Sequence, residues 1–127
     1  MAQRVVHTEG APGALGPYSQ AIEAGDWVFT AGQIGLDPES GELEESIESQ
    51  TTRALENIRA VLEAAGCGMD RIVKTTVFLR DMADFAAFNA VYAEMVADPP
   101  PARSTVQVAG LPKSALVEIE AVAYRGT

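Results

Sequence analysis

The chain has 127 residues, 47% of them hydrophobic, which is the size and composition of one globular domain spanning residues 1–127. Eighteen acidic residues against nine basic ones give a net charge of −9, which argues against nucleic acid as a partner because phosphate binding requires Lys and Arg. No apolar run approaches the roughly 18 residues of a membrane span, and Met1–His7 is too short and polar for a signal peptide. We therefore expect a cytoplasmic protein with no membrane partner.

The N-terminal part of the chain is predicted to consist of short strands. Gln3–His7 has the pattern of a first strand, and residues 9–17, rich in Gly, Pro and Ala, are typical of an irregular loop. Gln20–Ala24 and Trp27–Ala31 are predicted to pair as a hairpin, because the two residues between them, Gly25-Asp26, suit a tight turn.

Ser46–Ala65 carries the clearest helix pattern in the sequence. One apolar stripe recurs at helical spacing, formed by Ile47, Ala54, Leu55, Ile58, Val61, Leu62 and Ala65. Ser46 can cap the first turn, and Gly66 can end the helix in a left-handed conformation. These signals predict a helix with one buried face.

The C-terminal half is predicted to contain a strand, a helix and two further strands. The first strand is Arg71–Arg80, and we expect one face of it to carry Val73, Thr75, Val77 and Leu79. The helix runs over Met82–Val96 and is ended by the prolines that follow Asp98. Arg103–Ala109 and Ala115–Tyr124 are the last two strands.

This order of elements predicts an α+β fold, a mixed sheet with both helices packed on one face. In the last strand Val117, Ile119, Ala121 and Ala123 should face the helices, while Leu116, Glu118, Glu120 and Val122 face away. Apolar residues on that second face, with Phe78 on another strand, indicate that it is buried against another copy of the chain. Trp27 and the phenylalanines are assigned to the hydrophobic core.

The sequence contains no pattern for a metal or a cofactor. His7 is the only histidine, and we interpret it as an edge-strand residue rather than a catalyst. Cys67 is the only cysteine, so neither an intrachain disulfide nor a multi-cysteine metal site can form, and we interpret it as an ordinary reduced cysteine. The glycines follow no nucleotide-binding motif.

Four polar residues are candidates for a site. Arg103 opens a strand after a rigid proline segment and suits bidentate capture of a small carboxylate, or else anchors a loop. Glu118 lies on the face predicted to be buried between subunits, where a raised pKa or an interface salt bridge would result. Tyr18 is a pocket wall or a loop anchor, and Asn89 is a ligand contact or a helix-surface amide.

Several segments together resemble a known family. They are Gly16-Pro17-Tyr18-Ser19-Gln20, Ala31-Gly32-Gln33-Ile34, Ile72-Val73-Lys74-Thr75-Thr76-Val77-Phe78-Leu79, Pro101-Ala102-Arg103-Ser104-Thr105-Val106, Leu111-Pro112-Lys113 and Val117-Glu118-Ile119-Glu120-Ala121-Val122-Ala123. In this order, over nearly the whole chain, they are similar to the Rid (reactive intermediate deaminase, YjgF-type) proteins.

The resemblance implies a chorismate-mutase-like subunit in a homotrimer, with three sites between neighbouring subunits. It also implies an enzyme of metabolite damage control that needs no metal or cofactor. Its reaction would be hydrolysis of 2-iminobutanoate and 2-iminopropanoate to 2-keto acids and ammonia. By the same resemblance Arg103 binds the substrate carboxylate, Glu118 activates water, Tyr18 lines the pocket near the imine, and Asn89 shapes the cleft.

The backbone at Gly32 and Thr105 would complete the substrate site, next to Ala31. Many Rid proteins have serine at the position of Ala31 and cysteine at that of Thr105, so this chain lacks one hydroxyl near the substrate. That departure leaves open an alternative, a non-catalytic trimer that binds small 2-keto acids in the same cleft. RNA cleavage, attributed to parts of the family, fits poorly with the acidic charge and the lack of a basic groove.

Overall fold

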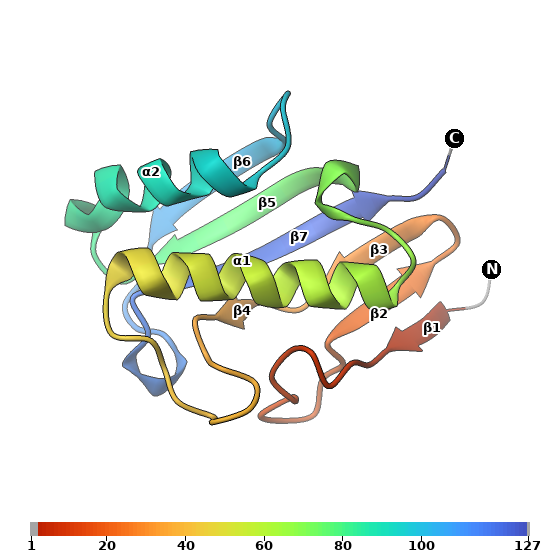
Figure 1. The fold of residues 1–127 in the computed structure, drawn as a ribbon, viewed down its shortest axis with the longest axis horizontal. Coiled ribbons are helices and arrows are strands. Elements are labelled where there is room, and N and C mark those ends of the chain that lie inside the picture. The colour runs from red at the N-terminus through yellow and green to blue at the C-terminus, as the bar shows by residue number, and fades with distance from the viewer. Residues whose placement is uncertain (1–2, 127) are drawn as a thin grey trace.

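The computed structural model describes residues 3–126, which form one mixed β-sheet and two α-helices (Figure 1). The strands are β1 (Gln3–Val6), β2 (Ala21–Ala24), β3 (Trp27–Thr30), β4 (Gln33–Ile34), β5 (Ile72–Leu79), β6 (Ala102–Gln107) and β7 (Val117–Tyr124). The helices are α1 (Ile47–Ala64) and α2 (Phe85–Met95), and short 3₁₀ turns cover Met69–Arg71, Met82–Asp84 and Pro112–Ser114. The predicted α+β class is confirmed.

The sheet has the strand order β1-β2-β3-β7-β5-β6, and β4 pairs with β7 beyond the end of β3. Only β5 and β6 run parallel, because α2 provides the crossover between them. The predicted hairpin is confirmed: Ala24 pairs with Trp27, and Gly25 has a φ of 62°. This topology makes β6 an edge strand and puts β7 in the middle of the sheet.

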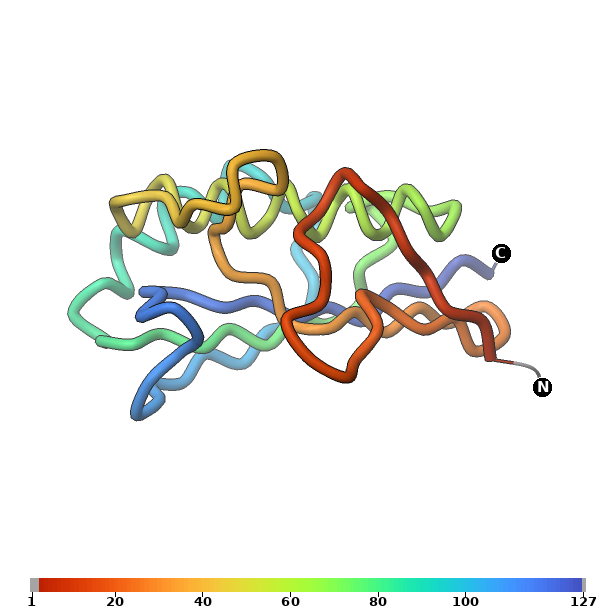
Figure 2. The backbone as a smooth tube through the Cα atoms, turned by 90° about the horizontal axis from the view of Figure 1, so that it is seen from below, coloured from red at the N-terminus to blue at the C-terminus, as the bar shows by residue number. Residues whose placement is uncertain are grey.

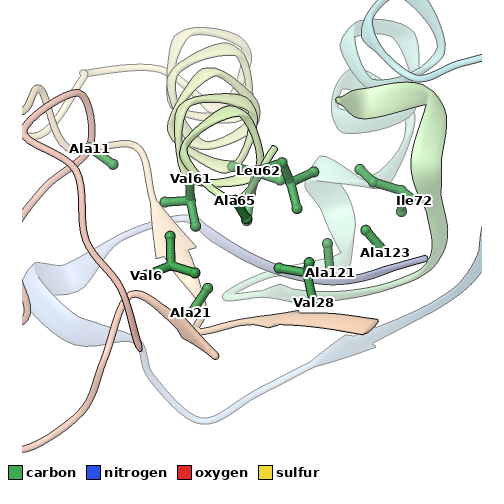
Figure 3. Packing of buried hydrophobic residues seen from close by; sticks show 11 residues of the cluster. Val6, Ala11, Ala21, Val28, Val61, Leu62, Ala65, Ile72, Ala121 and Ala123 are labelled. Carbon is green, nitrogen blue, oxygen red and sulfur yellow. The ribbon is translucent and has the colours of Figure 1, made fainter. Parts of the chain in front are cut away.

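Both helices cover the same face of the sheet, as Figure 2 shows from the side. The caps predicted for α1 are present, since the Ser46 hydroxyl accepts a hydrogen bond from the Ser49 amide and Gly66 adopts a φ of 79°. The buried face of α1 supplies Val61 and Leu62 to a cluster with sheet residues, and Ala65, which caps the end of the helix, joins it (Figure 3). A second cluster joins α1, α2, β5 and β7 around Leu55 and Phe88.

The alternation predicted for the last strand is confirmed within β7, but the prediction for Leu116 is wrong. Leu116 lies just before β7 and packs against the helix-side cluster around Leu55 and Phe88 instead of facing away from the helices. Val117, Ile119, Ala121 and Ala123 are buried beneath the helices, while Glu118, Glu120 and Val122 are only partly covered. We call the uncovered side of the sheet the open face; its apolar side chains include Trp27, Phe29, Phe78, Val106 and Val122. It is lined by apolar groups that no part of the described chain buries.

Two further predictions about buried residues are wrong. A bulge in the pairing of β5 with β7, between Ile72 and Lys74, shifts the strand by one residue, so Ile72 is buried and Val73 is 43% exposed. Trp27 and Phe29 are 41% and 47% exposed because β3 turns them to the open face. Of the phenylalanines, Phe88 alone is fully buried.

No helix within residues 3–126 is long and apolar enough to cross a membrane. The same residues contain no group of three or more His, Cys, Asp or Glu side chains arranged to hold a metal ion. His7 follows β1 with an exposed side chain 3.6 Å from Glu9, and burial raises the pKa of the Cys67 thiol. Neither residue lies near the candidate site.

Candidate functional site

Arg103 lies on the edge strand β6 with its side chain on the helix-covered side of the sheet. Its Cζ atom is 5.6, 5.4 and 4.9 Å from the ring centroids of Phe85, Phe88 and Tyr92 on α2. No carboxylate within residues 3–126 forms an ion pair with its guanidinium. A cation that is half-buried against ring faces and has no acidic partner is available to bind an external anion.

A pocket of about 600 Å³ opens beside Arg103. Asn89, Tyr92, Ala93, Val96 and Ala97 line it from α2 and the segment after it, and Asp98, Pro100, Pro101 and Arg103 complete the wall. The predicted partners Arg103 and Asn89 therefore share one cavity. The rest of its surface is largely apolar, and the prolines before β6 fix the approach of Arg103 to it.

Glu118 lies on β7 and points to the open face beside Gly32. A β-carbon added at Gly32 would lie 2.7 Å from the Glu118 Cδ atom and 2.9 Å from its Cγ, so only glycine permits this approach. Burial, and to a lesser extent the charge of Glu120, raises the pKa of the Glu118 carboxyl. No side chain or backbone group of residues 3–126 donates a hydrogen bond to the Glu118 carboxyl group. The carboxyl group is therefore available to accept a hydrogen bond from water or from a ligand.

The register of the sheet separates Arg103 from Glu118. Arg103 is paired with Thr75 on β5, and Glu118 with Phe78 on the same strand. Residues an odd number of positions apart on a strand point to opposite faces, so the two side chains lie on opposite sides of the sheet. A single protomer does not bring them together, and a shared site requires a second copy of the chain.

The remaining predicted residues fall into two groups. Thr105 points to the same side of the sheet as Arg103, two positions along β6, and its buried hydroxyl has no partner among the described residues. Ala31 and Gly32 lie between β3 and β4, next to Glu118. We call Arg103, Asn89 and Thr105 the arginine half-site, and Glu118, Gly32 and Ala31 the glutamate half-site.

Tyr18 is half exposed in the loop before β2. Its hydroxyl accepts a hydrogen bond from the Leu15 amide at 3.0 Å, and its own amide donates to the Gly16 carbonyl at 2.8 Å. The residue therefore holds the loop in a compact turn, as an anchor would, while 49% of its surface stays free. Both interpretations of Tyr18 agree with this placement.

Sequence reasoning missed the aromatic surroundings of Arg103. Phe85, Phe88 and Tyr92 recur at helical spacing on α2, but the phenylalanines were assigned only to the hydrophobic core and were not connected with Arg103. The signal that connects them to the site is tertiary, since β6 must be placed next to β5 before Arg103 can reach α2.

Comparison with known proteins identifies the family. A family model described as endoribonuclease L-PSP matches residues 8–125. Reactive Intermediate Deaminase A of Arabidopsis thaliana is 51% identical over 122 residues, covering 95% of this chain and 65% of that protein. This chain belongs to the Rid family. The resemblance found in its motifs is thereby confirmed.

Two further relatives of this Rid protein cover nearly its whole length. The 2-iminobutanoate/2-iminopropanoate deaminase of Salmonella typhimurium is 46% identical over 125 residues, which is 96% of this chain and 98% of that enzyme. The crystal structure of RidA from an Antarctic Psychrobacter is 45% identical, covers 95% and 98% of the two chains, and superposes with a TM-score of 0.93. The chain thus has the Rid fold.

Proposed function

We propose that this Rid protein hydrolyses reactive 2-imino acids, 2-iminobutanoate and 2-iminopropanoate among them, to 2-keto acids and ammonia. The observation that carries the proposal is Arg103, a half-buried cation with no acidic partner at the wall of a pocket. The Salmonella deaminase supports the choice of substrate. Removing such electrophiles would protect other enzymes from damage.

In the proposed reaction Arg103 binds the substrate carboxylate through two parallel hydrogen bonds. Glu118 accepts a proton from water as the water oxygen adds to the C=N carbon, and passes that proton to nitrogen. It then transfers the proton of the new hydroxyl to the same nitrogen as the C–N bond breaks, which leaves the 2-keto acid and ammonia. A carboxyl group whose pKa is raised by burial is better matched to this proton transfer than an exposed one. Asn89 and the backbone at Thr105 and Gly32 would orient the substrate between these two groups.

The two half-sites would meet between neighbouring copies in a homotrimer. The open face supports this assembly, because it exposes Phe29 and Val106, at 47% and 45%, on the same side of the sheet as Glu118. Burying those side chains against a neighbour gains roughly 1.5–3 kcal/mol for each one fully covered. The neighbour's arginine half-site would then complete the cleft.

Sedimentation tests the assembly. We expect the mass of three chains for the wild type, and dissociation with loss of turnover for Val106→Asp, because a carboxylate would be buried in the interface. Circular dichroism of the variant should still show a folded protomer, since Val106 contacts solvent there. A wild-type protein that sediments as a single chain contradicts the proposal.

Turnover is tested with imines made in the assay from alanine or 2-aminobutyrate by an amino-acid oxidase, following ammonia and keto acid. Arg103→Ala should lower kcat/KM by 30-fold or more, on the order of the 2–5 kcal/mol lost when one partner of a buried charge pair is truncated. Arg59→Ala is the matched control, because Arg59 is exposed on α1 and lies outside the site. Wild-type rates equal to buffer, or an Arg103→Ala rate equal to wild type, refute the proposal.

A second candidate function is a trimer that binds 2-keto acids without turnover. Ala31 favours it, since no hydroxyl is present beside Gly32 to assist Glu118. Calorimetric binding of a keto acid in the absence of imine hydrolysis would select this function. Binding of RNA at about 0.15 M salt would instead point to the endoribonuclease activity in the family's description. We expect no such binding, because the chain has a net charge of −9.

A further inference from the structure

Arg103 is surrounded on one side by three aromatic rings from a single helix. Phe85, Phe88 and Tyr92 are spaced at i, i+3 and i+7 on α2, which places them on one face of the helix. The Arg103 Cζ atom lies within 5.6 Å of all three ring centroids. Contacts within about 6 Å are those in which a cation is attracted by the ring quadrupole.

Tyr92, the nearest ring, is itself held in place. Its hydroxyl and the Thr75 hydroxyl are 2.6 Å apart in a buried hydrogen bond. Thr75 is the β5 residue paired with Arg103, so the bond ties α2 to the strand beside the arginine. Phe88 packs against Tyr92 with 5.2 Å between ring centroids, which further restricts the tyrosine.

We propose that Phe85, Phe88 and Tyr92 form an aromatic cage that positions the Arg103 guanidinium, and that Thr75 fixes Tyr92 within it. This inference rests on the proposed role of Arg103 as the carboxylate ligand. Aromatic ring faces can stack on the flat side of a guanidinium and leave its N–H edges free, whereas a carboxylate partner would occupy those edges. The cage therefore orders the arginine without competing with the substrate.

The cage also explains why the cation can stay half-buried without an acidic partner. Attraction to three ring faces offsets part of the cost of removing the guanidinium from water. A site whose main ligand is already ordered loses less side-chain entropy when the substrate binds. Tyr92 and Thr75 act through Arg103, so they are positioning residues rather than catalytic ones.

The test compares Tyr92→Leu, which removes the ring, with Tyr92→Phe, which keeps it. We measure the Kd of 2-oxobutanoate, a keto acid that is not turned over, together with kcat and KM for the imine. Tyr92→Leu should raise Kd and KM by about tenfold, with a smaller change in kcat. A tenfold loss of affinity corresponds to the strength of one partly buried cation–π contact. Tyr92→Phe should stay within about threefold of wild type.

The hydrogen bond between Thr75 and Tyr92 is tested by a double-mutant cycle. Thr75→Val and Tyr92→Phe should each raise Kd by up to about threefold, and the double variant should be no worse than the poorer single variant, because all three lose the same bond. Fully additive effects would show that Thr75 does not act through Tyr92.

Val61→Ala controls for general destabilisation, since Val61 is buried in the other core cluster and does not touch Arg103. If Val61→Ala weakens 2-oxobutanoate binding as much as Tyr92→Leu does, or if Tyr92→Leu binds as wild type, the cage is refuted. A wild type that binds 2-oxobutanoate but does not hydrolyse imines refutes the proposed function and leaves the cage standing.

The free protein supplies a readout that needs no ligand. The rings should displace the Arg103 Nε–H proton resonance from its usual position and slow its exchange with water. Both effects should be lost in Tyr92→Leu and kept in Tyr92→Phe. An Arg103 signal that is the same in wild type and Tyr92→Leu overturns the proposal even if 2-oxobutanoate does not bind.

Discussion

Replacing Gly32 with alanine places a methyl group where the Glu118 side chain now lies. The added carbon would be 2.7 Å from the Glu118 Cδ atom, and ordinary contacts between carbon atoms begin near about 3.5 Å, so the carboxyl group must move by about 0.8 Å. A displacement of this size can lower a rate by on the order of 10²-fold, which corresponds to about 2.7 kcal/mol in the activation free energy. We expect kcat/KM for imine hydrolysis to fall by that factor.

The fold should tolerate the same change. Gly32 is not among the glycines with a positive φ, so alanine introduces no backbone strain, and the group that must yield is the end of a flexible side chain. A Gly-to-Ala change at a compatible position stabilises a protein by about 0.4–1 kcal/mol through the unfolded state. The free energy of unfolding of Gly32→Ala should therefore stay within about 1 kcal/mol of wild type.

Imine turnover and urea unfolding are measured in parallel for Gly32→Ala and for Gly13→Ala. Gly13 is the matched control because nothing lies within 4 Å of its added carbon. The pKa of Glu118 in the Gly32 variant should also move back towards its ordinary value as the carboxyl becomes less buried. An unchanged kcat/KM in a folded Gly32→Ala protein would show that Glu118 has no part in the reaction as proposed.

Three further predictions concern stability. The raised folded pKa of Glu118 means that the folded state loses stability as the pH rises from the unfolded value, about 4.3, through the folded pKa, because ionising the carboxyl costs more in the folded protein. Glu118→Gln should therefore have a higher Tm than wild type at pH 7 and no advantage at pH 3. The Asn57 amide donates to the Ile34 and Leu36 carbonyls at 3.2 and 3.0 Å, and Asn57→Leu should cost about 2 kcal/mol in urea unfolding; no loss would mean that water replaces the amide. Ser46→Ala removes the N-cap of α1 and should lower the free energy of unfolding by about 1 kcal/mol, with Thr restoring most of it.

Local signals predicted the elements of the fold well. The stripe and caps of α1 come from residues within a few positions of one another, and the structure places its ends within one residue of the prediction. The alternation of buried and partly exposed side chains along β7 was likewise predicted from the sequence, because every second side chain of a strand points to the same side of the sheet. The two-residue strand β4 was missed, since a segment this short has no periodicity to detect.

Burial was harder to predict than element type. Trp27 and Phe29 are large and apolar, but they face the side of the sheet that the helices do not cover. Val73 was misplaced because a bulge shifts the strand by one residue, and a bulge depends on the partner strand as well as on the local sequence. The sequence also predicted that the face of the sheet away from the helices carries apolar side chains. Trp27 and Phe29 lie on that face, so their exposure in a single chain agrees with this second prediction.

By itself, the sequence determined the family, the order of the elements other than β4, and the two residues on which the proposed chemistry depends, because motifs and periodicity are properties of neighbouring positions. Only the tertiary structure decided that Arg103 and Glu118 face opposite sides of one sheet, since that follows from the strand pairs Thr75–Arg103 and Phe78–Glu118. It also decided that α2 surrounds Arg103 with aromatic rings. Pairing and packing join residues far apart in the chain, and their geometry depends on the whole sheet rather than on any single segment.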